Sequence, residues 1–209
     1  PDRAFVDPAE MKPRFDLAGR QTILTFGLLA PDKGIETMIA AMPRIVADHP
    51  DAVYVVLGAT HPNLKRQEGE AYRESLVARA AELGVTDNVR FVDAFLDTPE
   101  LLDWLQAADV YVTPYLKEGQ ITSGTLSYAV GLGKPVVATP YVHACEILSG
   151  NHGVLVEFAD SHGLAHEVSA LLSDDAAREK LARRAYALGR TMIWERIAQR
   201  AVGLLEEVA

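Results

Sequence analysis

At 209 residues, the chain is long enough to bury one good hydrophobic core with some appendages. It is 49% hydrophobic and 23% charged, a composition typical of soluble globular proteins, and its formal net charge of -9 argues against a nucleic-acid-binding surface. Cys145 is the single cysteine, which excludes an internal disulfide framework. With no apolar run of membrane-spanning length and no signal-like leader in the sequence, we predict a cytoplasmic protein without a membrane span.

Strand-like and helix-like segments alternate along the chain from residue 21. Apolar strands are predicted at 21–26, 52–57, 89–92, 110–113, 135–138 and 154–156. Apolar residues at helical spacing and capping residues predict helices from 35 onward, at 69–83, from 98 to about 108, at 123–133 and around 144–148. From residue 161 the pattern is purely helical, with segments at 161–172, 174–189 and 192–207.

Six short strands that alternate with helices indicate an α/β fold, a doubly wound, mostly parallel, six-stranded Rossmann-like sheet with C-terminal helices. Residues 21–190 are predicted to form this domain, and residues 191–209 a C-terminal helix. Residues 1–20 contain three prolines and many charges, which favours a linker or edge segment over a targeting signal.

The segment from Ala107 to Glu146 places polar groups where an open parallel sheet binds ligands. A strand that stops at Pro114 is followed by a polar loop, and Ser123-Gly124-Thr125 then open a helix. These groups lie at the carboxyl end of one strand and the amino end of the next helix, which is the ligand-binding edge of such sheets. The unpaired N–H groups and partial positive charge of a helix amino terminus suit phosphate.

Two earlier turns lead to the same edge. Gly27 lets the backbone turn tightly or a ligand come close, and Lys33 stands just before the next helix; a plain turn with a solvated lysine is the alternative. Gly58 and His61 follow the second strand, where an ordinary loop with one exposed histidine is the simpler interpretation. Since His61 has no carboxylate or second ligand near it in the sequence, no metal site is predicted.

The polar loop of the third turn carries Glu118, Gln120, Thr122 and Ser123, whose carboxylate, amide and hydroxyl groups suit the hydroxyls of a sugar. Ser123 is also an ordinary helix N-cap, which needs no ligand. Other mechanisms are set aside, because no G-x-G-x-x-G follows a strand, Pro135 stands where a P-loop needs Ser or Thr, and no G-x-S-x-G is present.

Six motifs, taken in order, carry a resemblance to a known family. In the first half of the chain, GLLAPDKG at 27–34 matches the family pattern G-R-L-x-x-x-K-G, Gly58 matches a glycine after the second strand, and Val89-Arg90-Phe91 matches V-x-F. Further along, Ala108 to Pro114 matches A-D-V-x-V-x-P, and Gly131 to Ala138 matches A-x-G-x-P-V-V-A. Glu146 matches an acidic residue that opens a later helix of the family. In this register the chain resembles the C-terminal, donor-binding half of a GT-B glycosyltransferase of family 4. The resemblance extends from about Gln21 to the last helix.

The chain departs from that family in its charged residues. The family arginine that meets the donor diphosphate falls on Leu28, and the paired glutamates E-x7-E fall on Gln120 and Tyr128. Gln120 still donates and accepts hydrogen bonds, whereas Tyr128 offers a ring or a phenol to a ribose in place of a carboxylate. The chain therefore resembles a divergent branch of the family.

The resemblance implies transfer of a sugar from a nucleotide diphosphate sugar, with retention at the anomeric carbon and without a cofactor or a metal. It implies a catalytic role for Lys33 at the leaving diphosphate, which would also contact Gly27, Ser123, Gly124 and Thr125. The donor sugar would meet Gln120, Glu118 and Thr122, and the nucleoside would meet Gly58, Phe91, Val92 and Tyr128.

GT-B enzymes place the acceptor site in an N-terminal half, so the resemblance also implies an N-terminal acceptor-binding domain as partner and little turnover by this chain alone. Two alternatives stay open. One is a non-catalytic nucleotide-sugar-binding module, in which the missing glutamates and arginine signal lost activity. The other is half of a GT-B sugar-nucleotide epimerase or phosphorylase.

Overall fold

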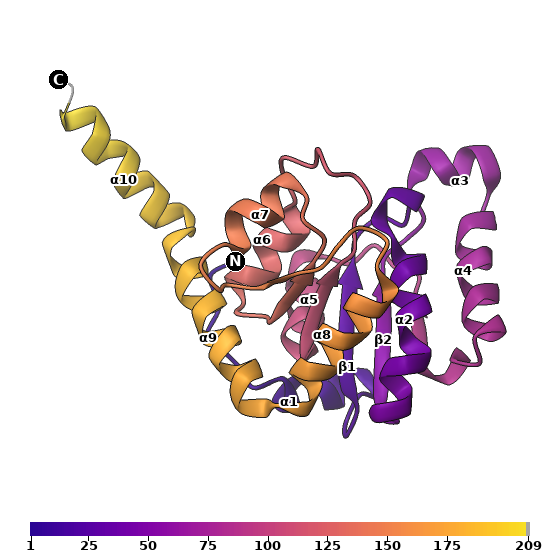
Figure 1. The fold of residues 1–209 in the computed structure, drawn as a ribbon. Helices are drawn as coiled ribbons and strands as arrows, with labels where there is room; N and C mark the ends of the chain where they lie inside the picture. Colours follow the sequence, from indigo (N-terminus) through magenta and orange to yellow (C-terminus); the bar gives the residue numbers. More distant parts are fainter. Residues whose placement is uncertain (208–209) are drawn as a thin grey trace.

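Six parallel strands form the centre of the protein in a computed structural model that describes residues 1–207 (Figure 1). The strands are β1 (Gln21–Phe26), β2 (Ala52–Leu57), β3 (Val89–Val92), β4 (Val110–Thr113), β5 (Val136–Ala138) and β6 (Val154–Leu155). They lie in the order β3-β2-β1-β4-β5-β6, and every neighbouring pair is parallel. The predicted doubly wound, Rossmann-like sheet is confirmed.

Helices cover both faces of the sheet, and two hydrophobic cores result. Successive strand residues such as Ile23 and Leu24 belong to opposite cores. The first core contains α2 (Ile35–Asp48), α4 (Ala71–Glu82) and α8 (Ser161–Ser173), and the second contains α5 (Thr98–Ala107), α6 (Gly124–Gly131) and α7 (Val142–Leu148). Burial on both faces explains why the strands read as uninterrupted apolar runs.

The remaining elements lie at the edges of this sandwich. They are α1 (Pro8–Met11), α3 (Pro62–Glu68), α9 (Asp175–Thr191), α10 (Trp194–Glu207) and the short 3-10 turns η1 (Lys12–Phe15), η2 (Pro31–Lys33) and η3 (Thr86–Asn88). α9 packs along α6 and α8, whereas α10 projects away from the body (Figure 1). The three predicted C-terminal helices are confirmed, with ends shifted by at most two residues.

The segment after β2 differs from the prediction. The sequence predicts one helix at 69–83, but the structure adds α3 before it and begins α4 at Ala71. Pro62 occupies the first turn of α3, and His61 caps the helix by accepting a hydrogen bond from the N–H of Asn63. Gly69, with a φ of 65°, separates the two helices. Histidine is not among the strong N-cap residues, which is why the pattern did not indicate α3.

Residues 1–20 are fastened beside the amino ends of the strands. Arg3 forms an ion pair with Asp103 of α5 at 2.5 Å, and Lys12 bonds to Asp109, just before β4, at 2.6 Å. The Asp109 carboxylate also accepts a hydrogen bond from the N–H of Thr22 in β1. One buried carboxylate thus joins the incoming segment to two strands.

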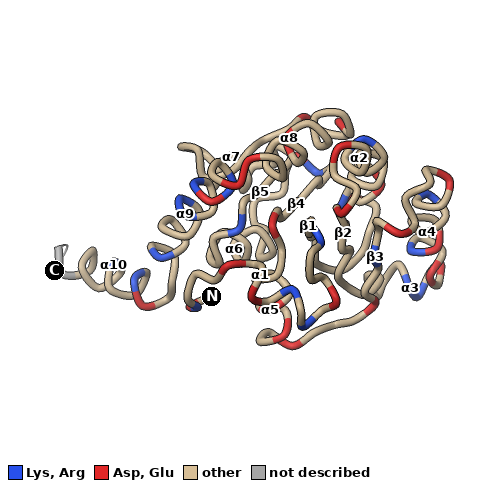
Figure 2. Tube along the Cα trace, turned by 90° about the horizontal axis from the view of Figure 1, so that it is seen from below, with Lys and Arg blue, Asp and Glu red and all other residues tan. Residues whose placement is uncertain are grey.

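Acidic and basic residues are interleaved on the outer helices, as Figure 2 shows for α4 and α9. On α9, for example, Arg183 pairs with Glu179 one turn earlier at 2.7 Å. This pattern is typical of solvated helix faces. Within residues 1–207, none of the helices combines the length and the apolar character needed to cross a bilayer.

Candidate functional site

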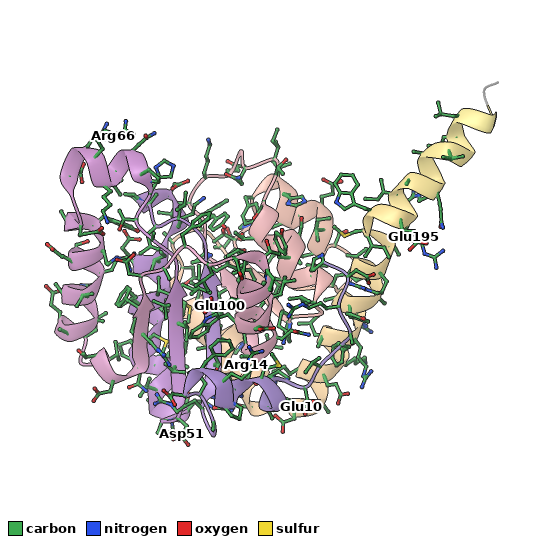
Figure 3. All side chains as sticks on the ribbon, turned by 180° about the vertical axis from the view of Figure 1, so that it is seen from behind. Glu10, Arg14, Asp51, Arg66, Glu100 and Glu195 are labelled. Atoms are coloured by element: carbon green, nitrogen blue, oxygen red, sulfur yellow. The ribbon has the colours of Figure 1, made fainter. Side chains whose placement is uncertain are left out.

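The strand order reverses between β1 and β4, and a cleft of about 520 Å³ opens beside the loops that follow these two strands. Open α/β sheets bind ligands at this switch point, outside the carboxyl ends of the strands. Figure 3 shows the two ends of the molecule, with Asp51 before β2 at one end and Arg66 in α3 at the other. The cleft lies at the α3 end. It is lined by residues of the loop after β1 and of α3, and by Tyr115 and Thr125.

Two close contacts hold the loop after β1 against the end of β4. The N–H of Leu116 donates to the carbonyl oxygen of Asp32 at 2.9 Å. Gly34 has a φ of +63°, and a Cβ atom there would overlap the carbonyl oxygen of Pro114, so only glycine permits this approach. This packing brings Lys33 to the end of β4.

Lys33 supplies a positive charge to the cleft. Its ammonium nitrogen lies 4.4 Å from the centre of the Tyr115 ring and 3.5 Å from a carboxylate oxygen of Asp32. The Tyr115 hydroxyl in turn lies 2.7 Å from the Oγ1 of Thr125, in the first turn of α6. Tyr115 therefore connects a cation to a helix amino terminus, and both of these groups attract phosphate.

Tyr141 supports the Tyr115 ring with an uncharged side chain. The two rings stack with their centroids 5.1 Å apart, and the Tyr141 hydroxyl lies 3.0 Å from the Oγ1 of Thr113. Burial raises the pKa of the Tyr141 phenol above its usual value, so this group stays neutral at physiological pH. It therefore does not offset the charge of Lys33.

Ser123 is the N-cap of α6, as one of its two interpretations predicts. Its Oγ accepts a hydrogen bond from the N–H of Leu126 at 3.3 Å and lies 3.0 Å from the Oγ1 of Thr125. Its own N–H donates to the Nδ1 of His143 at 3.0 Å. Among residues 1–207, the N–H groups of Gly124 and Thr125 find no acceptor, so these two groups are available to a ligand.

A second cleft, of about 530 Å³, shares Gly27 and Leu28 with the first. The ends of β1 and β2, including Gly58, form part of its wall, and residues 94–98 after β3 form another part. Its lining is mostly apolar, which suits a flat ring such as a nucleoside base. The two clefts together offer neighbouring sites for a phosphate group and for a ring.

Arg73 on α4 connects the loops after β2 and β3. Its buried guanidinium donates to the carbonyl oxygen of Gly58 at 2.7 Å and to the carboxylate of Asp93 at 2.8 Å. A carboxylate oxygen of Glu70 lies 3.5 Å from the Nε of Arg73. The hydrogen bond that Glu70 accepts from Lys65 is the main reason that the pKa of Glu70 falls to about 2. No motif in the sequence indicates this network.

The residues predicted to meet a nucleoside lie in different places. Gly58 lines the second cleft. The side chain of Phe91 packs against the first core and that of Val92 against the second, while the Val92 carbonyl oxygen accepts the N–H of Gly58 at 2.9 Å. Tyr128 has its ring 6.3 Å from that of Phe26 and lines a separate cavity of about 700 Å³ beside the start of α10. Of these four, only Gly58 borders the second cleft in the described part of the chain.

The residues predicted to meet a sugar lie on the loop between β4 and α6. Glu118 and Thr122 are exposed, and the carboxamide of Gln120 donates to the carbonyl oxygen of Thr122. Main-chain bonds fasten the loop to α7, because the N–H of Val142 donates to Glu118 at 3.0 Å and that of His143 to Gln120 at 3.1 Å. The loop leads into the amino end of α6. Among the residues that the structure describes, the lining of the first cleft does not include the side chains of Glu118, Gln120 or Thr122.

Sequence reasoning missed several residues that line the first cleft. Tyr115 stands two residues after the end of the predicted strand at 110–113, so its position after Pro114 was a usable signal. Asn63 and Gln67 reach the cleft from α3, an element that was not predicted, whereas His61, which was predicted in a loop at this edge, is the N-cap of that helix. Within residues 1–207, no group of three or more His, Cys, Asp or Glu residues is arranged to hold a metal ion.

Comparison with known proteins identifies the family. The sequence profile of the glycosyl transferases group 1 matches residues 20–174. The chain belongs to this family. A GDP-mannose-dependent alpha-(1-6)-phosphatidylinositol monomannoside mannosyltransferase of Mycolicibacterium smegmatis is 30% identical over 197 residues, which cover 90% of this chain and 47% of that protein. A phosphatidyl-myo-inositol mannosyltransferase of the same organism is 27% identical over 192 residues, 90% of this chain and 46% of that protein.

Solved structures agree with this membership in the glycosyl transferases group 1. The C-terminal domain of a group 1 family protein from Francisella tularensis matches with a TM-score of 0.76 and 25% identity, over 89% of this chain and 97% of that one. The Anabaena protein HepE, solved in complex with UDP, shares the fold with a TM-score of 0.81 and 20% identity, over 98% of this chain and 54% of that one. This group 1 chain spans about half the length of the curated relatives it matches, and its fold is that of a GT-B C-terminal domain.

Proposed function

We propose that this group 1 domain binds a nucleotide diphosphate sugar and forms the donor half of a retaining glycosyltransferase of family 4. One observation carries the proposal, which is that Lys33 and Thr125, in the first turn of α6, line a single cleft at the strand-order switch. Membership of the glycosyl transferases group 1 supports the class of reaction. The position of the cleft supports a ligand that carries phosphate.

The proposed chemistry is stabilisation of the leaving group. When the bond from the anomeric carbon to the diphosphate breaks, negative charge grows on the phosphate oxygens. Lys33 and the N–H groups of Gly124 and Thr125 would stabilise that charge, and Gly27, with a φ of +134°, lets the phosphates approach the backbone. Preorganised donors of this kind contribute about 3–4 kcal/mol each to transition-state stabilisation. Because the protein supplies the charge, the proposal includes no cofactor and no metal ion.

The rest of the donor would occupy the neighbouring parts of the site. The base would enter the second cleft beside Gly58, held mainly by backbone groups near Phe91 to Ala94, and the sugar would meet Gln120 in the loop before α6. Relatives named as GDP-mannose-dependent make GDP-mannose the first donor to test, and they support transfer of a hexose.

The proposed partner is an N-terminal acceptor-binding domain. The mannosyltransferase relatives are about twice as long as this chain, which covers 47% and 46% of them. Helix α10 supports the proposal of a partner domain, because it exposes large apolar side chains that a partner could cover. They include Trp194, Val202, Leu204 and Leu205. The chain alone would bind donor and turn over little. The proposed location is the cytoplasm, because a lone cysteine fits a reducing compartment.

A second candidate is a binding module without transferase activity. It is favoured by Leu28, Gln120 and Tyr128, which stand where the family has an arginine and two glutamates. Such a module would keep the nucleotide site, because Lys33 and the amino end of α6 are present. The two candidates therefore differ in turnover and not in binding.

Calorimetry with GDP-mannose, UDP-glucose and ADP-glucose tests the proposal directly. We expect one of the three to bind the chain with one site, and the matching nucleoside diphosphate to compete for it. Binding by none of them would refute the donor-site assignment. In the full-length protein that contains this domain, release of nucleoside diphosphate on addition of acceptor supports the transferase, whereas tight binding without release supports the module.

A further inference from the structure

His143, in the first turn of α7, holds the loop that leads into α6. Its ring Nδ1 accepts a hydrogen bond from the N–H of Ser123 at 3.0 Å, and its main-chain N–H donates to the carbonyl oxygen of Gln120 at 3.1 Å. The preceding residue, Val142, donates its N–H to the carbonyl oxygen of Glu118 at 3.0 Å. Two main-chain bonds and one side-chain bond thus fasten residues 118–123 to one helical turn.

The bond from Ser123 requires a neutral imidazole. An N–H donor needs the lone pair of Nδ1, so the ring proton resides on Nε2. Partial burial lowers the pKa of His143, and the carboxylate of Glu146, on the same helix, opposes that shift. The loop adds the exposed Lys117 and Glu118, and the first turn of α6 adds no titratable side chain. At physiological pH the ring therefore remains an acceptor.

Ser123 transmits this constraint to the first cleft. Its Oγ lies 3.0 Å from the Oγ1 of Thr125, which lies 2.7 Å from the hydroxyl of Tyr115. The ammonium nitrogen of Lys33 lies 4.4 Å from the centre of the Tyr115 ring. A continuous series of contacts therefore leads from the imidazole of His143 to the groups proposed to bind phosphate.

We propose that His143 is a positioning residue for donor binding, because its neutral ring holds Ser123 and thereby aims the N–H groups of Gly124 and Thr125 at the diphosphate. The inference rests on the proposed donor site. Protonation would place a second N–H against that of Ser123, so the bond would break and the loop would loosen. Donor affinity should then fall as the pH drops through the pKa of His143.

The test is donor affinity as a function of pH in three variants. A nucleotide sugar is the probe, since its diphosphate is esterified at both ends and does not titrate near neutral pH. Between about pH 7.5 and about pH 5, the unsubstituted chain should lose roughly three- to tenfold in affinity, the scale of one hydrogen bond. His143→Asn offers an acceptor in place of Nδ1 and does not titrate, so it should stay within about twofold at both values.

His143→Leu removes the acceptor and should bind weakly at both pH values. His166→Asn is the matched control, because His166 is exposed on α8, and its profile should follow the unsubstituted chain. Full affinity in His143→Leu at neutral pH would overturn the inference. So would a loss of affinity at low pH in His143→Asn equal to that of the unsubstituted chain.

Nuclear magnetic resonance separates this inference from the proposed function. If no nucleotide sugar binds, the donor site is wrong, but the bond itself is still measurable. The ring nitrogens should report a neutral imidazole protonated on Nε2, and the Ser123 amide should resist exchange in the unsubstituted chain and in His143→Asn. Rapid exchange at Ser123, or a proton on Nδ1 at neutral pH, would refute the positioning role. The same spectra show whether His143→Leu is folded.

Discussion

A Cβ atom on Gly58 would overlap the carbonyl oxygen of Gly27. These two glycines follow the neighbouring strands β1 and β2, with φ values of 134° and 147° that other residues rarely adopt. Their close approach forms a wall of the second cleft. Glycine is needed at both positions, since a side chain at either one meets an unfavourable φ and Gly58 has no space for one.

Gly58→Ala should therefore destabilise the domain strongly. We expect a loss of about 3 kcal/mol or more in the free energy of unfolding, because strain at φ and steric overlap act together. Gly19→Ala is the control, since Gly19 has a φ of 75° but open space around it. That control should lose only about 1 kcal/mol. Urea denaturation measures both, and equal losses would show that overlap with Gly27 is not the cause.

Lys33→Ala should weaken nucleotide binding. Its ammonium group is the cation that the first cleft offers a diphosphate, and a hydrogen bond to a charged group contributes about 1.5–3 kcal/mol. We expect roughly a 10- to 150-fold loss of affinity by calorimetry. Lys117→Ala, an exposed lysine on the nearby loop, should have little effect. Unchanged affinity in Lys33→Ala would remove Lys33 from the site.

Gln120→Ala should weaken a nucleotide sugar more than the bare nucleoside diphosphate. The predicted register places the residue where the family has its first glutamate, and hydrogen bonds lost in a closed site cost about 1–2 kcal/mol. Gln120→Glu should be tolerated. In the structure the carboxamide also binds the carbonyl oxygen of Thr122, so an equal loss for both ligands would mean that Gln120 shapes the loop. The sugar contact would then pass to Glu118.

Lys134 should make stability depend on pH. Its side chain is only 3% exposed, it donates to the carbonyl oxygens of Gln106 and Ala108, and burial lowers its pKa to about 7. The unfolded chain keeps that proton up to about pH 10, so it binds more protons than the folded state between about pH 7 and pH 10. The free energy of unfolding should therefore rise with pH in this window.

Lys134→Met should abolish this rise and also lower stability by about 1–3 kcal/mol, because two buried carbonyl oxygens lose their donor. Lys180→Met, at an exposed position on α9, is the control and should keep the pH dependence of the unsubstituted chain. Denaturation at about pH 7 and about pH 9 compares them. The same slope in all three proteins would mean that another group titrates.

The strands were predictable because their signal is local. A parallel strand buried on both faces is a continuous apolar run, and residues 52–57 (AVYVVL) have no other plausible place than the middle of a sheet. The turns after the strands were predictable too, since Gly27, Lys33 and Ser123 stand at fixed offsets from strand or helix ends. Open parallel sheets bind ligands at the carboxyl ends of their strands, so these positions predicted that Lys33 and the amino end of α6 lie on one side of the sheet.

Only the tertiary structure decided which groups of that edge remain free to bind. The N–H of Ser123 was an equal candidate beside those of Gly124 and Thr125, but it is occupied by His143, 20 residues further along the chain. Tyr115 joins Lys33 to Thr125 in the same way. Such bonds link segments that are distant in sequence, and a side chain's direction in space leaves no periodic pattern, so sequence places these residues at the edge without showing how they pair.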